Sequence, residues 1–185
     1  MVVLVMGTTG AGKTTVGKIL AARLRWTFLD ADDFHPQANI DKMHHGIPLT
    51  DADRLPWLEK IHTELLRQTQ SGKNIVLACS ALKQSYRDML SSQVDMRIVY
   101  LRGTYDVMRQ RIESRHGHFA GEDILAGQFA DLEEPRNALV LDVSRSPQPE
   151  HRYSAASGRT GGPESARWCD PVLLTQSGLF GPGYD

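Results

Sequence analysis

The residues between Gly7 and Thr14 are the first in this chain whose types and spacing could do chemistry. They match the pattern G-x-x-x-x-G-K-[ST] in full. In such a loop the glycines let the backbone curl so that successive N–H groups point at phosphate oxygens. The lysine reaches the terminal phosphates of a nucleotide, and the hydroxyl after it can ligate Mg²⁺. We therefore expect ATP and Mg²⁺ to be held by Gly7, Thr8, Thr9, Gly10, Ala11, Gly12, Lys13, Thr14 and Thr15.

The context of this loop supports a phosphate site over a chance match. Residues 2–6 form a short, continuous apolar run, which is typical of a strand buried on both faces of a parallel sheet. Residues 14–24 have apolar positions at helical spacing. A strand before the loop and a helix after it are the setting that the pattern requires. The positive end of the helix dipole would also favour phosphate.

Two carboxylates follow the next expected strand, at residues 27–29. Asp30 and Asp32 lie two positions apart, at the edge of the sheet where the phosphate loop also begins. Phosphoryl transfer needs a Mg²⁺ anchor and a group that orients or deprotonates the attacking hydroxyl. We expect Thr14 and Asp30 to hold the metal. Lys13 and Asp32 are the expected catalytic residues, and Asp32 would also contact the acceptor.

The third expected strand distinguishes between classes of phosphate-loop protein. Residues 74–78 end at Cys79 and Ser80 without the acid that motor proteins and GTPases carry there. The chain also lacks the N-K-x-D sequence with which GTPases recognise guanine. These features favour a small-molecule kinase.

Strand and helix patterns alternate along the first three quarters of the chain. This order predicts an α/β fold with a parallel sheet and helices on both faces. Residues 31–53 are polar and contain Pro36, Gly46 and Pro48, so no regular element is predicted there. The expected strands are 2–6, 27–29, 74–78, 96–101 and 138–143, and the expected helices are 14–24, 54–70, 81–91, 105–115 and 122–132.

The character of the sequence changes near residue 144. Residues 144–185 are rich in Ser, Gly and Pro and have little periodicity. In this architecture a covering helix should follow the fifth strand, but no convincing helix pattern is present. We expect a kinase domain over residues 1–143 and an atypical, poorly ordered tail over residues 144–185.

Composition excludes several classes of function. The 185 residues carry a formal net charge of −1, whereas binding to bulk nucleic acid or to an anionic membrane usually needs a clear basic excess. No run approaches the roughly 20 apolar residues of a membrane span. The two cysteines, Cys79 and Cys169, fit no metal spacing and suggest a reducing compartment. The expected location is the cytoplasm, with no nucleic-acid and no membrane partner.

Several further motifs together resemble those of one known family. They are Asp30-Ala31-Asp32-Asp33-Phe34-His35-Pro36, Lys42-Met43, Gly46-Ile47-Pro48-Leu49-Thr50-Asp51, Asp53-Arg54, Pro56-Trp57-Leu58, Ala78-Cys79-Ser80-Ala81-Leu82-Lys83, Tyr86-Arg87-Asp88, Gly117-His118-Phe119 and Gln128-Phe129. With the phosphate loop, this ordered series resembles gluconokinases of the small phosphate-loop type, whose fold is similar to that of shikimate and nucleoside-monophosphate kinases. The resemblance runs from residue 2 to about residue 143.

This resemblance implies a fold, a reaction and a quaternary structure. The fold would be a three-layer phosphate-loop kinase with a five-stranded parallel sheet and a small lid at about residues 115–131. The reaction would be the ATP-dependent phosphorylation of D-gluconate to 6-phospho-D-gluconate. The protein could form a homodimer. In related kinases the lid brings arginines to the transferring phosphoryl group, so Arg115 is the expected catalytic arginine, with Arg111 as the second candidate.

Gluconate carries a carboxylate and several hydroxyls, so its site needs a cation and polar groups. Arg54 is the expected carboxylate partner because it begins the helix after the polar segment. Lys83 and Arg87 are further candidates. Ser80 could bond a substrate hydroxyl or cap the following helix. Trp57 is expected to pack within its helix interface and not to stack on a ligand.

Two alternative functions stay open at this point. The acceptor could be another small molecule, such as shikimate or a nucleoside monophosphate, within the same fold. The protein could also bind ATP with impaired catalysis, because the atypical residues 144–185 take the place of the adenine-contacting loop and final helix that the family resemblance implies.

Overall fold

The computed structural model describes residues 1–116 and 122–144, apart from the side chains of residues 115, 116 and 122. These residues belong to one compact unit, Met1–Ser144. The predicted tail lies almost wholly outside the described residues, as does the middle of the predicted lid. The order of the tail and the extent of the lid therefore stay predictions.

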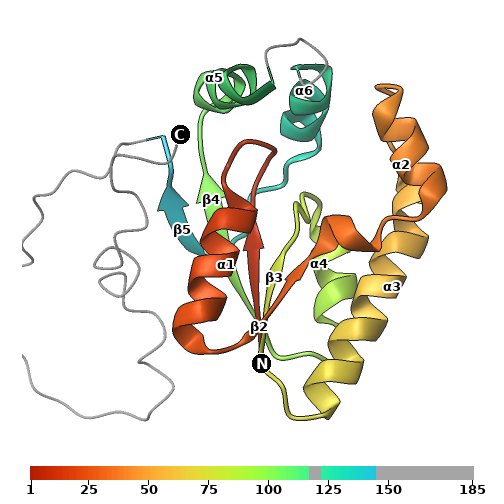
Figure 1. The fold of residues 1–185 in the computed structure, drawn as a ribbon, viewed down its shortest axis with the longest axis vertical. Coiled ribbons are helices and arrows are strands. Elements are labelled where there is room, and N and C mark those ends of the chain that lie inside the picture. Colours follow the sequence, from red (N-terminus) through yellow and green to blue (C-terminus); the bar gives the residue numbers. More distant parts are fainter. Residues whose placement is uncertain (117–121, 145–185) are drawn as a thin grey trace, which may run out of the picture. The chain divides into compact units, whose positions relative to one another are not determined.

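Five strands form one parallel sheet in the order β2-β3-β1-β4-β5, and this confirms the predicted α/β fold (Figure 1). The strands are β1 (Val2–Met6), β2 (Thr27–Asp30), β3 (Ile75–Ala78), β4 (Met96–Arg102) and β5 (Leu139–Asp142). The helices are α1 (Lys13–Leu24), the 3-10 helix η1 (Ala31–Phe34), α2 (Gln37–His44), α3 (Asp51–Gln70), α4 (Gln84–Ser91), α5 (Tyr105–His116) and α6 (Glu122–Asp131).

The main core lies between the sheet and two helices. Alternate residues of β1 and β3 point to this side, because successive side chains of a strand face opposite ways. They pack against α3 and α4, while α1 contacts β1, β2 and β3 on the other face (Figure 1). The core includes Val2, Leu4, Met6, Trp57, Leu58, Ile61, Leu65, Ile75, Leu77, Tyr86 and Leu90.

The carboxyl end of the sheet carries the elements that surround the expected site. The phosphate loop follows β1, η1 follows β2, and α5 follows β4. Helices α5 and α6 contact each other and lie beyond this end of the sheet (Figure 1). None of the helices in residues 1–116 and 122–144 is long and apolar enough to cross a membrane.

Two elements within residues 31–53 were missed by the sequence prediction. The Asp30 carboxylate accepts a hydrogen bond from the Asp32 N–H and thereby caps η1. Pro36 precedes α2 as its N-cap, which suits a residue with a fixed φ and no N–H. Both elements are short and are held by local hydrogen bonds. The apolar periodicity of this segment is too weak to have predicted them.

Helix α3 begins at Asp51 and not at the predicted Arg54. Thr50 is its N-cap, and its hydroxyl accepts from the Asp53 N–H while the Asp53 carboxylate accepts from the Thr50 N–H. Such a capping box satisfies two amides at the start of a helix. Lys42 Nζ lies 2.7 Å from Asp53 Oδ1. This hydrogen bond is the largest of the interactions that lower the pKa of Asp53 to about 2.

Candidate active site

The phosphate loop has the backbone shape that phosphate binding requires. Gly10 and Gly12 adopt φ values of 80° and 91°, which favour glycine. Open space surrounds Gly12, since a Cβ built there would meet no atom within 4 Å. Gly12 is also the N-cap of α1 and offers no side chain to the first amides of that helix. No side chain at Gly12 therefore competes with an anion for these amides, and their binding of phosphate stays a prediction.

Lys13 lies within this loop and is close to two carboxylates. Its Nζ donates to the Thr8 carbonyl oxygen at 3.0 Å. Burial lowers the pKa of Lys13, although the negative charges of Asp32 and Asp30 act in the opposite direction. The adjacent Cys79 is buried, and this burial raises the pKa of its thiol to about 12, so the thiol stays protonated at neutral pH.

The two predicted acids lie together beside the loop. The Thr14 hydroxyl donates to Asp30 Oδ2 at 2.8 Å, which puts two hard oxygen ligands side by side. Asp32 is exposed to solvent, yet partial desolvation by neighbouring atoms raises its pKa, and the Asp30 charge raises it further. Asp32 therefore holds a proton to higher pH than an ordinary aspartate does.

Trp57 fixes the turn that presents these acids. Its indole Nε1 donates to the Ala31 carbonyl oxygen at 2.7 Å, and its ring stacks on His35 with centroids 4.4 Å apart. These contacts hold the residues on both sides of Asp32. Trp57 packs in the helix interface as expected, and it also positions the acidic turn, which the sequence did not reveal.

Arg54 and Lys83 are brought together in one charged cluster, which we call the cation pair. Arg54 Nη1 lies 3.1 Å from the Tyr86 hydroxyl, 3.2 Å from Asp131 Oδ2 and 3.5 Å from Asp51 Oδ1. Lys83 Nζ lies 2.8 Å from Asp51 and 3.7 Å from Asp131. Two cations and two carboxylates leave the cluster without net charge. Hydrogen bonds from Lys83 and Tyr86 lower the pKa of Asp51.

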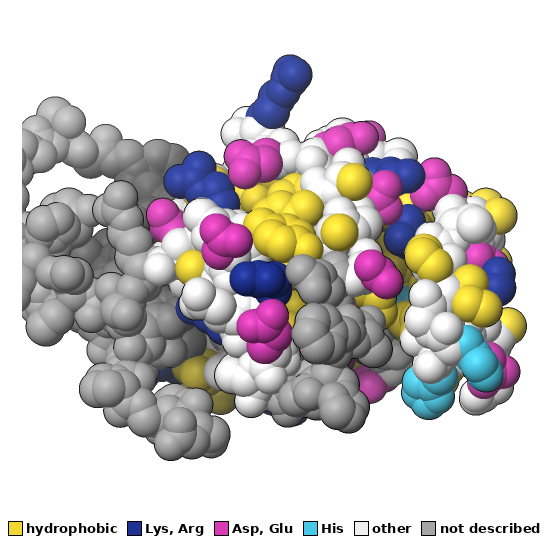
Figure 2. Space-filling view, turned by 90° about the horizontal axis from the view of Figure 1, so that it is seen from above, with side chains coloured by type: hydrophobic (Ala, Val, Ile, Leu, Met, Phe, Trp, Pro, Cys, Tyr) yellow, Lys and Arg dark blue, Asp and Glu magenta, His cyan; other side chains and the backbone are white. Residues whose placement is uncertain are grey.

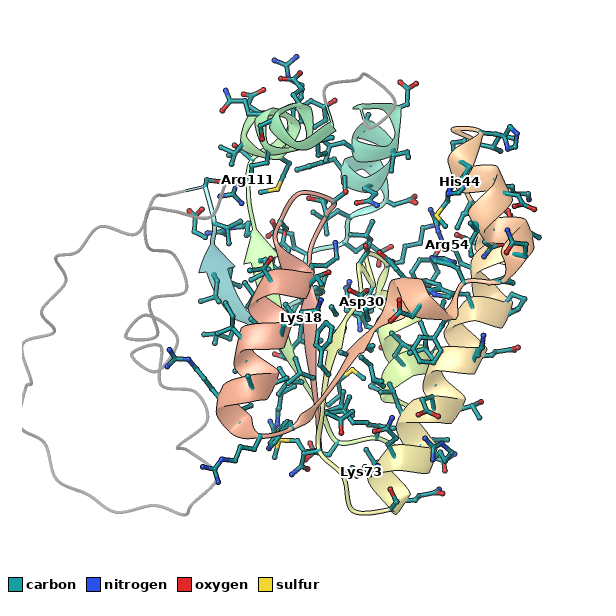
Figure 3. All side chains as sticks on the ribbon, viewed as in Figure 1. Lys18, Asp30, His44, Arg54, Lys73 and Arg111 are labelled. Atoms are coloured by element: carbon teal, nitrogen blue, oxygen red, sulfur yellow. The ribbon has the colours of Figure 1, made fainter. Side chains whose placement is uncertain are left out.

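This cluster lies on the same side of the sheet end as the acids. Besides burial, the positive charge of Arg54 contributes to lowering the pKa of His35. The charge of His35 in turn acts to lower the pKa of Asp32, so the three side chains are close enough to interact electrostatically. In Figure 3, Asp30 and Arg54 lie toward the end of the sheet occupied by α5 and α6, and Lys73 lies at the opposite end. Seen from above, Figure 2 shows acidic and basic side chains intermixed on this face.

Arg87 does not belong to this group, and its contacts favour a structural role over the expected substrate contact. The residue is only 2% exposed. Its guanidinium donates to the carbonyl oxygens of Ala81 and Leu82 at 2.9 and 2.8 Å and to Gln84 Oε1 at 2.8 Å. These bonds hold the segment between β3 and α4 and explain why α4 begins at Gln84, later than predicted. Arg87 is thus a buried structural cation.

The remaining predicted residues have different outcomes. Ser80 is partly exposed just after β3, and its substrate contact stays a prediction. Arg111 lies on α5, and its guanidinium donates to the Val143 carbonyl oxygen at 2.7 Å. Arg115 is the penultimate residue of α5, but its side chain lies outside the described residues, so its catalytic role also stays a prediction.

Helix α6 supplies two contacts that the sequence reasoning missed. Gln128 Oε1 accepts a hydrogen bond from the Thr9 N–H of the phosphate loop at 2.6 Å. Asp131 pairs with Arg54, as described above. In the sequence, Gln128 stood out only as part of the Gln128-Phe129 motif. That motif does not indicate which residues the Gln128 side chain contacts.

The fold and the phosphate loop together define a phosphate-loop kinase. The sequence model described as shikimate kinase matches residues 9–152. A probable gluconokinase of Mus musculus is 42% identical over 166 residues, which span 78% of this chain and 90% of that protein. The thermoresistant gluconokinase of Escherichia coli is 38% identical over 147 residues, spanning 77% and 84% of the two chains. By its sequence model the chain belongs to the shikimate kinase family, and by its relatives it belongs to the gluconokinases.

A solved structure agrees with this membership. The crystal structure of a gluconokinase from Sinorhizobium meliloti has a TM-score of 0.70 and 40% sequence identity. It covers 77% of this chain and 82% of its own. The phosphate-loop kinase fold that the motifs implied is therefore confirmed.

Proposed function

We propose that this protein transfers the terminal phosphoryl group of ATP to D-gluconate, giving 6-phospho-D-gluconate and ADP. The observation that carries the proposal is the grouping of a phosphate loop, the pair Asp30 and Asp32, and the cation pair at one end of the sheet. Gluconokinase relatives at 38–44% identity support the choice of acceptor.

On the donor side, the loop amides and Lys13 would bind the phosphates of ATP. Thr14 and Asp30 would hold Mg²⁺, which is typically bound by one or two protein oxygens together with phosphate oxygens and water. When bound, the metal neutralises charge on the phosphate oxygens. Lys13 would stay close to the transferring group, since its burial and its bond to Thr8 restrict its movement.

On the acceptor side, Asp32 would accept a hydrogen bond, or the proton itself, from the attacking hydroxyl. Its raised pKa moves it toward the range in which a carboxylate can work as a general base. Its exposure leaves it accessible to an acceptor. Arg115, near the C-terminus of α5, is the proposed arginine for the transferring phosphoryl group.

The cation pair would bind the acceptor's carboxylate. Because the cluster is already neutral, an incoming carboxylate must replace Asp51 or Asp131 on one of the cations. The displaced carboxylate could then accept hydrogen bonds from the acceptor's hydroxyls. This exchange favours an acid that also carries several hydroxyls over a simple polyol. Cytoplasmic location and a homodimer remain predictions from the sequence and the resemblance.

A coupled ADP-release assay across acceptors tests the proposal. D-Gluconate, shikimate and nucleoside monophosphates are offered to the purified protein with ATP and Mg²⁺. We expect turnover with gluconate to exceed turnover with the others by at least about 10²-fold in kcat/KM, as expected for a site that hydrogen-bonds its substrate's polar groups. Turnover with shikimate or a nucleotide, but not with gluconate, would reject the proposal.

A further inference from the structure

The contact between Gln128 and the phosphate loop has no role in the mechanism given above. Thr9 is a member of the loop, and its N–H points to Gln128 Oε1 at 2.6 Å. The two residues are 119 positions apart in sequence. A loop amide can donate only to the oxygen of a side-chain amide, so this bond fixes which end of the Gln128 amide faces Thr9.

The other end of the amide, Nε2, is a hydrogen-bond donor next to the loop. An amide nitrogen lies on the order of 2 Å from its own oxygen, so Nε2 lies close to the phosphate loop. The one hydrogen bond that the Gln128 side chain makes to another described residue uses Oε1, not Nε2. A side-chain amide offers two N–H donors, and anionic phosphate oxygens are among the strongest acceptors.

The position of Gln128 is set by a firmly held helix end. Three acids within and just after α6 make contacts with other elements. Asp131 pairs with Arg54, Glu133 Oε2 accepts from the Gln84 N–H at 2.6 Å, and Glu134 accepts from the Tyr100 hydroxyl at 3.2 Å. Leu125, one turn before Gln128, is fully buried. Gln128 therefore projects from an anchored helix and needs little ordering when a ligand binds.

We propose that Gln128 contacts the donor nucleotide, with Nε2 donating to an oxygen of its terminal phosphates while Oε1 stays on the Thr9 amide. This inference rests on the proposed use of ATP. It assigns the residue a binding role beyond packing α6 against the loop. The side chain would act as a neutral donor that adds to the charges of Lys13 and the metal.

Two substitutions separate this role from a purely structural one. Gln128→Glu keeps an oxygen that can accept from Thr9 but replaces the donor with a second anionic oxygen. Gln128→Leu removes both the acceptor and the donor. A phosphate contact predicts that both variants weaken binding, with the glutamate variant affected at least as much, because like charges repel. A structural contact alone predicts that the glutamate variant, which keeps the Thr9 bond, loses less affinity than the leucine variant, and that its loss largely disappears in high salt, which screens charge repulsion.

The measurement is the dissociation constant of adenylyl imidodiphosphate with Mg²⁺, determined by calorimetry on the full chain. We expect it to rise by about tenfold or more in both variants, as for the loss of a hydrogen bond to a charged group. Melting temperatures establish that each variant is folded. Gln110, which is exposed on α5, provides matched controls in Gln110→Glu and Gln110→Leu. These should bind like wild type.

Binding of the analogue to Gln128→Glu within about twofold of wild type would overturn the inference, whatever the leucine variant does. This outcome differs from a failure of the proposed function. If the wild-type chain itself bound no analogue, the use of ATP would be rejected. If it bound the analogue but did not phosphorylate gluconate, only the acceptor would be wrong.

Discussion

Replacing Arg87 with methionine tests whether this buried cation is structural. Methionine fills a similar volume but cannot donate hydrogen bonds. The carbonyl oxygens of Ala81 and Leu82 would lose donors at 2.9 and 2.8 Å. Each buried acceptor left without a partner costs about 1–3 kcal/mol. Burial lowers the pKa of Arg87, so removing its charge offsets part of this loss.

The expected net loss in free energy of unfolding for Arg87→Met is about 3 kcal/mol. In a domain of this size, 1 kcal/mol lowers the Tm by about 2–4 °C, so we expect a decrease of about 6–12 °C. The KM for gluconate, measured well below this Tm, should change by less than about tenfold, because the buried Arg87 guanidinium already donates to Ala81, Leu82 and Gln84. Thermal melting and steady-state kinetics give both quantities.

The matched control is Arg97→Met. Arg97 is exposed and lies 3.8 Å from Asp95, so its loss should change stability by no more than about 0.5 kcal/mol. An Arg87→Met protein with an unchanged Tm and a KM for gluconate raised well over about tenfold would refute the structural assignment. That result would instead support the contact between Arg87 and the substrate that the sequence predicted.

Three further substitutions test Asp32, the capping box of α3 and the bond that holds the turn after β2. Asp32→Asn should lower kcat by on the order of 100-fold. The same change should raise the Tm at neutral pH, because the folded pKa of Asp32 is raised and its ionised form therefore opposes folding; a lower Tm would contradict this. Asp53→Asn should destabilise the protein at neutral pH, and the difference should shrink as the pH falls from about 4 toward the folded pKa of about 2. A pH-independent difference in urea denaturation would exclude that linkage. Trp57→Phe keeps ring stacking but loses the bond to Ala31, so it should cost about 1–2 kcal/mol and reduce kcat without raising the KM for ATP; wild-type kcat would show that this bond does not position the acids.

The sequence predicted the parts of the site that depend on local pattern. The phosphate loop combines a fixed spacing with a strand before it and a helix after it. Asp30 and Asp32 follow a strand of a parallel sheet, so their position beside the loop follows from topology alone. The strand and helix order similarly required the parallel sheet, since alternating elements have few other ways to bury their apolar faces.

Contacts between distant segments could not be predicted in this way. Arg87 and Arg54 have the same chemistry, and only the fold shows that one is buried under backbone carbonyls while the other meets Asp131. Gln128 reaches Thr9 across 119 positions. The start of α3 was predicted three residues too late. The capping box of Thr50 and Asp53 is present in the sequence, but the polar residues around it gave no helical pattern.

Direct identification of the product is the most direct test of the central claim. The purified protein is incubated with ATP, Mg²⁺ and D-gluconate, and the products are followed by ³¹P and ¹³C nuclear magnetic resonance. A Lys13→Met variant serves as the inactive control. The account predicts one phosphate monoester on the C6 oxygen of gluconate, formed in equal amount to ADP and absent with the variant. Release of inorganic phosphate with unmodified gluconate, or a phosphoester at another carbon, would contradict it.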